Sequence, residues 1–111
     1  MDQTMATVVL NPNWRDTVTF SAGNPEPQIL AENEHHKVIL AGLAAGSQIP
    51  AHPEGLATYH ILEGAGWMSI DDRRVQIEAG ATIITPDGAS RGIEAETPLA
   101  FLAVRVTTGT G

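Results

Sequence analysis

Residues 46–66, GSQIPAHPEGLATYHILEGAG, contain the pattern that decides the fold of this chain. A strand-like run, ATYHIL (57–62), lies between a loop rich in proline and glycine and the turn EGAG (63–66). Glycine accepts backbone conformations that other residues avoid, and proline fixes φ, so both residues mark turns. The stretch therefore predicts a loop, a short β-strand and a tight turn, in that order.

The rest of the chain continues this pattern of short strands and turns, and only NPNWRD (11–16) and PEPQILAENEHH (25–36) leave room for a helical turn. Short segments rich in Val, Ile and Thr between glycines and prolines are typical of an all-β sandwich or a closed barrel. The predicted strands are DTVTF (16–20), KVILAGL (37–43), ATYHIL (57–62), WMSI (67–70), RRVQIE (73–78), ATIIT (81–85) and LAFLAVRVTT (99–108).

Composition excludes several classes of function. The 111 residues suit one domain, and the absence of cysteine excludes disulfides and thiolate chemistry. A net charge of −7 with no basic run argues against a nucleic-acid partner. The chain has neither a basic start followed by an apolar run nor an apolar run of the ~20 residues that span a bilayer. We expect a cytoplasmic protein with no membrane partner.

Five turn residues stand in a familiar order: Gly46, Gly64, Gly80, Pro86 and Gly88. The order resembles the two motifs of the cupin superfamily, G-x5-H-x-H-x(3,4)-E-x6-G and G-x5-P-x-G-x2-H-x3-N. The resemblance implies an all-β, cupin-type antiparallel β-barrel, also described as a double-stranded β-helix or jelly roll. It also implies a single cupin domain over 1–111, with an N-terminal arm (1–20) and a barrel core at about 38–106. We expect Gly64, Gly66 and Gly88 to take turn conformations that a β-branched residue would resist.

The sequence departs from the family pattern where metal-bearing cupins keep their ligands. Ala57 stands at the glutamate position, Arg91 at the histidine position of the second motif, and Ala95 at the asparagine position. Counted from Gly46, His52 is the first motif histidine and Glu54 replaces the second. Counted back from the glycine at 64, His52 is instead the second histidine, and a proline replaces the first. In metal-bearing cupins the metal ligands are the two histidines and the glutamate of the first motif and the histidine of the second. Both registers leave only one of these four ligands in this sequence.

A different metal site remains an alternative. His52, Glu54 and His60 supply two imidazoles and a carboxylate, which suit a divalent transition metal such as Zn, Fe, Mn or Ni. Strand parity opposes this set, because Tyr59 points into the barrel if Ala57 does, and His60 then points out. Without a β-bulge, the pattern favours no metal cofactor.

Arg91 has a functional interpretation and a structural one. An arginine at a former ligand position places a planar cationic fork in the lumen, and such a fork binds carboxylate or phosphate in two-point fashion. With His52, Glu54 and Tyr59, it would bind a small anionic molecule. The structural interpretation is a salt bridge, to Glu54 for example, or plain exposure at a strand end.

Two functions from different classes follow. The first is a cupin that binds a small, anionic molecule in the lumen without the usual metal. The second is a metal-dependent cupin enzyme of the dioxygenase, isomerase or decarboxylase type, with an altered ligand set. A metal-free acid–base reaction through His52 and Tyr59 lies between them, so enzymatic activity stays open. Strands that are apolar on both faces, KVILAGLAAG (37–46) and LAFLAV (99–104), predict a homodimer.

Overall fold

The computed structural model describes residues 8–23 and 27–106, so residues 1–7 of the predicted arm and the last two residues of the predicted strand 99–108 lie outside it. The described part contains one short 3-10 helix, Trp14–Asp16, and otherwise only strands. None of its helices is long and apolar enough to cross a membrane. The ten strands are β1 (Phe20–Ser21), β2 (Gln28–Glu32), β3 (His36–Leu43), β4 (Gln48–Pro53), β5 (Leu56–Glu63), β6 (Ala65–Ile70), β7 (Arg73–Glu78), β8 (Thr82–Thr85), β9 (Ser90–Ala95) and β10 (Leu99–Val106).

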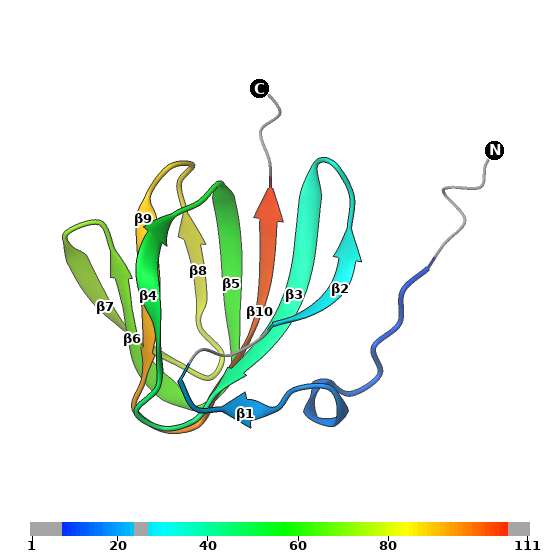
Figure 1. The fold of residues 1–111 in the computed structure, drawn as a ribbon, viewed down its shortest axis with the longest axis horizontal. Helices are drawn as coiled ribbons and strands as arrows, with labels where there is room; N and C mark the ends of the chain where they lie inside the picture. The colour runs from blue at the N-terminus through cyan, green and yellow to red at the C-terminus, as the bar shows by residue number, and fades with distance from the viewer. Residues whose placement is uncertain (1–7, 24–26, 107–111) are drawn as a thin grey trace.

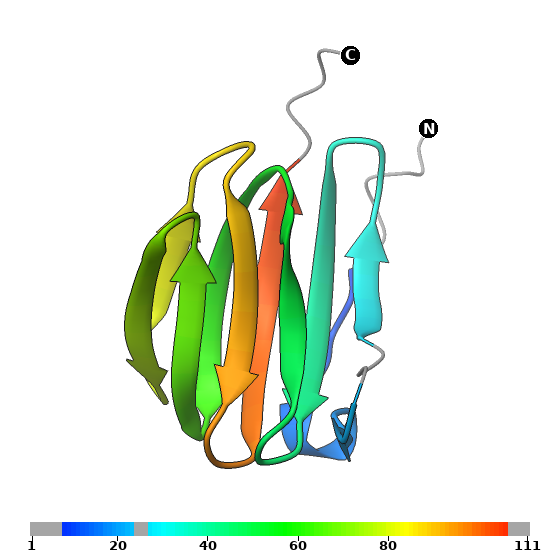
Figure 2. The same ribbon diagram turned by 60° about the vertical axis from the view of Figure 1, so that its left-hand side comes forward.

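These strands form two facing sheets (Figure 1). The six-stranded sheet has the order β1-β3-β10-β5-β8, with β2 also paired to β3, and the four-stranded sheet has the order β4-β9-β6-β7. Every pairing is antiparallel except that of β1 with β3. Figure 2 shows the two sheets curving around one interior. The predicted all-β antiparallel barrel is confirmed.

The core lies between the sheets and follows from period-two alternation along each strand. In β10, Phe101 and Ala103 point inward and are buried, whereas Leu102 and Val104 between them face out and stay partly exposed. In β5 the inward residues are Ala57, Tyr59 and Ile61, so the predicted parity of this strand is confirmed. The largest fully buried side chains are Leu43, Ile61, Met68, Ile77, Leu99 and Phe101.

Two segments have a different secondary structure from the one predicted. Most of 16–20 lies outside any strand, and the helical turn allowed in 11–16 forms at Trp14–Asp16, capped by the side chain of Asn13. The other segment in which a helical turn was allowed, 25–36, contains β2 instead.

Strands β4 and β9 were not predicted, because two prolines in β4 and a glycine in β9 look like strand breakers. Proline is tolerated in β4 because that strand lies at a sheet edge.

The glycines of the two motifs serve two different purposes. Gly64 and Gly88 have φ of 86° and 85°, which confirms the predicted turn conformations. Gly66 is not a turn residue, contrary to the prediction, because it belongs to β6. A Cβ at this position would collide with the main-chain carbonyl of Glu94 on the neighbouring strand. The reason for this glycine is therefore the close approach of two strands.

Candidate functional site

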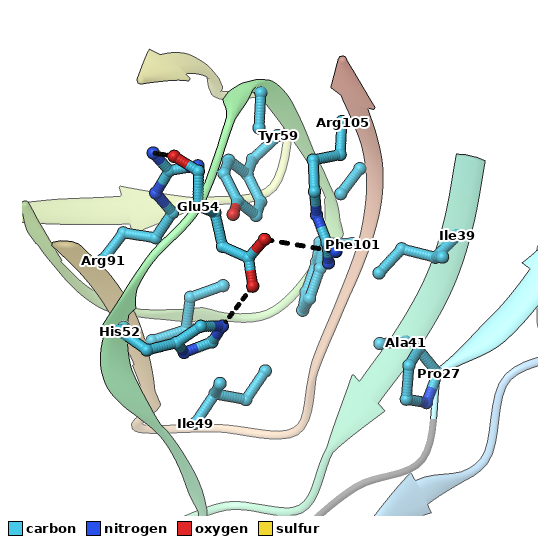
Figure 3. Close-up of a pocket in the computed structure, with 14 residues that line it drawn as sticks. Pro27, Ile39, Ala41, Ile49, His52, Glu54, Tyr59, Arg91, Phe101 and Arg105 are labelled. Carbon is cyan, nitrogen blue, oxygen red and sulfur yellow. Dashed lines mark hydrogen bonds and ion pairs between the residues drawn. The ribbon is translucent and has the colours of Figure 1, made fainter. Parts of the chain in front are cut away.

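A cavity of about 160 Å³ opens between the two sheets at one end of the barrel. The loops that follow β4 and β8 meet the end of β10 there, at the top of Figure 1. Its wall is mainly apolar, as Figure 3 shows. The apolar side chains come from both sheets and include Ile39, Ile49, Ala57, Ile93, Phe101 and Ala103.

Five polar side chains share this cavity: His52, Glu54, Tyr59, Arg91 and Arg105. The sequence predicted the first four as ligand-binding residues, and all four lie in the lining of this one cavity. His52 and Arg91 are direct partners across β4 and β9, so their side chains stand on the same face of the sheet. Their role in binding stays a prediction.

His52 reaches the cavity because β4 is irregular. Ile49 and His52 both line the cavity although three positions separate them, which regular alternation does not allow. The register between β4 and β9 shifts between these two residues. Such a bulge turns the following side chains to the opposite face.

Arg91 is only 2% exposed, and main-chain carbonyls surround its guanidinium group. Nε donates to the carbonyl of Ala89 (3.0 Å), Nη1 to Gly55 (2.6 Å), and Nη2 to Glu54 (3.1 Å) and Pro86 (2.9 Å). Among the described residues, no carboxylate forms an ion pair with Arg91. Both structural interpretations, a salt bridge to the Glu54 carboxylate and plain exposure, are wrong, because Arg91 is buried and bonds only the Glu54 main chain.

The carboxylate of Glu54 faces two other groups across the cavity mouth (Figure 3). Its Oε2 lies 2.7 Å from Nε2 of His52, and its Oε1 lies 3.3 Å from Nη1 of Arg105. The second ring nitrogen of His52, Nδ1, lies 3.1 Å from the carbonyl of Pro50. Carbonyl and carboxylate oxygens only accept, so both contacts of His52 are hydrogen bonds only when both ring nitrogens carry a proton, as in the imidazolium form.

Tyr59 is buried, with 7% of its surface exposed, and its ring packs at a tilt on Phe101 at 5.8 Å between centroids. No hydrogen bond to its hydroxyl occurs within residues 8–23 and 27–106. The hydroxyl oxygen faces the cavity in Figure 3. A buried hydroxyl without a partner is uncommon and costs stability, which is why it marks a place for a ligand or a water molecule.

His60 lies on the outer face of β5, where its Nδ1 contacts Oγ1 of Thr82 at 2.7 Å. The alternative metal set of His52, Glu54 and His60 is therefore not assembled, because strand parity sends His60 away from the cavity. In the part of the chain that the structure describes, no group of three or more His, Cys, Asp or Glu side chains is placed to hold a metal ion.

Arg105 is the cavity residue that sequence reasoning missed. It follows Phe101 and Ala103 at a spacing of two on β10, and it pairs across the sheet with Ala57. Continuing the inward alternation of LAFLAVRV to its end would have placed this arginine in the lumen.

The comparisons with known proteins agree with this architecture. Residues 36–105 match the model of the cupin domain family. A conserved protein of unknown function from Streptococcus pyogenes is 23% identical, with a TM-score of 0.80 over 95% of this chain and 90% of that chain. An uncharacterised double-stranded β-helix protein from Klebsiella pneumoniae is 21% identical (TM-score 0.79, 89% and 90% covered).

A third solved structure, a cupin superfamily protein from Desulfitobacterium hafniense, is 16% identical, with a TM-score of 0.76 over 82% of this chain and 84% of that chain. At these identities the likeness shows the fold alone. No curated protein matches the chain. Since the family model covers well over half of the residues, the chain belongs to the cupin superfamily.

Proposed function

We propose that this cupin binds a compact, mainly apolar molecule with one anionic group in the cavity between its sheets. The observation that carries the proposal is the guanidinium of Arg91, which is buried in the cavity wall and has only uncharged hydrogen-bond partners. A buried charge without a counter-ion is costly, even where dipoles solvate it. An anion in the cavity supplies the missing counter-charge.

In this proposal Arg91 attracts the ligand through its charge and does not bind it through bidentate hydrogen bonds. Carbonyl oxygens take most of its N–H groups, and together they fix the guanidinium in place. Coulomb attraction does not need a direct contact, and it is stronger beside buried apolar surface than in bulk water. The direct hydrogen bonds to the ligand then come from Tyr59, whose hydroxyl is unpartnered among the described residues, and from the groups at the mouth.

The size and lining of the cavity narrow the class of ligand. An engineered apolar cavity of roughly 150 Å³ binds benzene, and the cavity here measures about 160 Å³. Its walls carry aliphatic side chains and the ring of Phe101. A molecule of about the size of benzoate therefore fits both the volume and the apolar surface.

Calorimetric titration with benzoate, and with benzamide as its uncharged counterpart, tests the proposal. We expect benzoate to bind more tightly. Tyr59→Phe should weaken benzoate binding by about tenfold or more, because a hydrogen bond to a charged group contributes about 1.5–3 kcal/mol. His60→Gln, one residue along β5 and on the outer face, is the matched control and should leave affinity unchanged. Equal binding of benzoate and benzamide, or full affinity in Tyr59→Phe, would contradict the proposal.

A further inference from the structure

We propose that Glu54 determines the specificity of this cavity: its carboxylate occupies an anion subsite formed by Arg105 and His52, and an anionic ligand displaces it. The inference rests on the proposed function, since it names the atoms that would receive the anionic group. It makes Glu54 an internal competitor of the ligand and not a partner of it.

The geometry of the subsite is that of a carboxylate receptor. Nε2 of His52 and Nη1 of Arg105 approach different oxygens of one carboxylate, at 2.7 and 3.3 Å. The two donors come from opposite sheets, β4 and β10, and meet at the cavity mouth (Figure 3). A guanidinium and an imidazolium spaced in this way suit any carboxylate of the same size. The carboxylate that they hold in the structure is part of the chain itself.

The backbone that carries Glu54 is fixed, while its side chain is less constrained. The carbonyl of Glu54 accepts from Nη2 of Arg91 and from the main-chain N–H of Gly88 (2.8 Å), and the next carbonyl, that of Gly55, accepts from Nη1 of Arg91. The Glu54 side chain is 23% exposed, and its charged contacts are those with His52 and Arg105. Rotation of its side-chain torsions therefore releases the subsite without unfolding the loop.

A place for the displaced carboxylate lies next to the cavity. A second hollow of about 330 Å³ shares Glu54 and Arg105 with the first and has a polar lining. Lys37 lines this hollow and pairs with Glu32 there (3.6 Å), and Asp87 lines it too, so a rotated Glu54 side chain meets a polar surface of mixed charge instead of apolar surface. The cost of displacement is then the exchange of one set of polar contacts for another.

Competition of this kind sets which ligands enter the subsite. A group tethered by a few bonds competes at an effective concentration on the order of millimolar. An uncharged ligand competes poorly with a carboxylate for Arg105, because it cannot restore the lost attraction between opposite charges. An anionic ligand puts another negative group in the place of the Glu54 carboxylate and so keeps the attraction to Arg105 and His52. Glu54 therefore lowers affinity for all ligands that use the subsite and lowers it most for uncharged ones.

Calorimetric titration of benzoate into wild-type protein and Glu54→Gln tests the inference. Glutamine keeps the shape but loses the charge, so we expect affinity for benzoate to rise about five- to tenfold, since each partly exposed ion pair released contributes up to about 1 kcal/mol. Arg105→Gln should weaken benzoate binding. Glu94→Gln is the matched control, because it removes the same charge from a glutamate that pairs with an arginine (Arg74, 2.8 Å) on the outer face. Melting temperatures of all variants show that they fold.

The outcomes separate this inference from the proposed function. Weaker binding in Glu54→Gln would mean that Glu54 contacts the ligand directly, and unchanged binding would mean that the anion lies elsewhere in the cavity. If Tyr59→Phe still weakens benzoate binding, either result overturns the inference about Glu54 and leaves the proposed function standing. A rise in affinity of Glu94→Gln equal to that of Glu54→Gln would reduce the effect to net charge and would also overturn it. Absence of benzoate binding in every variant overturns both.

Discussion

Arg91 donates a hydrogen bond to the main-chain carbonyl of Glu54, while the side-chain carboxylate of Glu54 pairs with Arg105. One arginine thus fixes the backbone of the loop after β4, and another holds the side chain that the loop presents. Nη2 of Arg91 also reaches the carbonyl of Pro86, in the loop after β8. The two loops that border the cavity are therefore tied to one buried guanidinium.

Replacement of Arg91 by lysine should destabilise the protein while keeping the charge. A lysine ammonium has three donors and no planar fork, so some of the carbonyls of Glu54, Gly55, Pro86 and Ala89 would stay buried without a partner. We expect the free energy of unfolding to fall by about 2–4 kcal/mol, since lost hydrogen bonds to a charged donor cost about 1.5–3 kcal/mol each. Urea denaturation followed by tryptophan fluorescence measures this change.

The control for that variant is Arg74→Lys on the outer face. Arg74 is about half exposed, stacks on Trp67 at 4.2 Å and pairs with Glu94. Exposed pairs contribute roughly 0–1 kcal/mol, so Arg74→Lys should change stability little. Equal losses in the two variants would show that the carbonyl contacts of Arg91 do not stabilise the cavity mouth.

Alanine at Gly64 should cost far more stability than alanine at Gly88. Both positions have positive φ, which costs an L-residue about 1–2 kcal/mol. At Gly64 a Cβ would also collide with the carbonyl of Pro98, whereas nothing lies within 4 Å of a Cβ at Gly88. Thermal unfolding of the two variants compares them directly. A melting temperature of Gly64→Ala at or above that of Gly88→Ala would contradict the close approach at this turn.

The protein purified without a histidine tag should contain no stoichiometric transition metal. The reason is electrostatic: Arg91 puts a permanent positive charge in the wall of the cavity, and a cation there meets repulsion that little solvent screens. Elemental analysis by mass spectrometry measures the metal content. One equivalent of Zn, Fe, Mn or Ni per chain would favour the metal-dependent enzyme instead.

We expect the protein to be a homodimer at micromolar concentration. Apolar residues on its surface include Ile84 of β8, which is 67% exposed, and the consecutive residues Val8, Val9 and Leu10. The segment that carries these three runs clear of the barrel in Figure 1. A second copy of the chain would remove such surface from water. Sedimentation velocity tests this, and Ile84→Glu should shift the protein toward monomer if β8 is part of the interface. A monomeric wild-type protein would contradict the expectation.

Local sequence pattern and the family motif predicted most of the strands and four of the five polar side chains of the cavity, all but Arg105. Alternation along β5 placed Tyr59 inside and His60 outside, and the family motif placed Arg91 in the lumen; the structure has Tyr59 and Arg91 in the cavity lining and His60 on the outer face. These features depend on residues close together in the sequence. The direction of a side chain in a strand follows from its neighbours two positions away, and glycine at a positive φ is a property of one residue.

The contacts of the cavity depend on tertiary structure instead. The chain by itself determined an all-β barrel with a histidine, a tyrosine and an arginine near its mouth. Only the tertiary structure decided that a bulge in β4 turns His52 inward, that Arg91 binds two carbonyls of one loop, 36 and 37 residues away, and that Glu54 meets Arg105. The physical reason is that hydrogen-bond partners are selected by which loops pack together, and loop packing is not encoded in the period of any single strand.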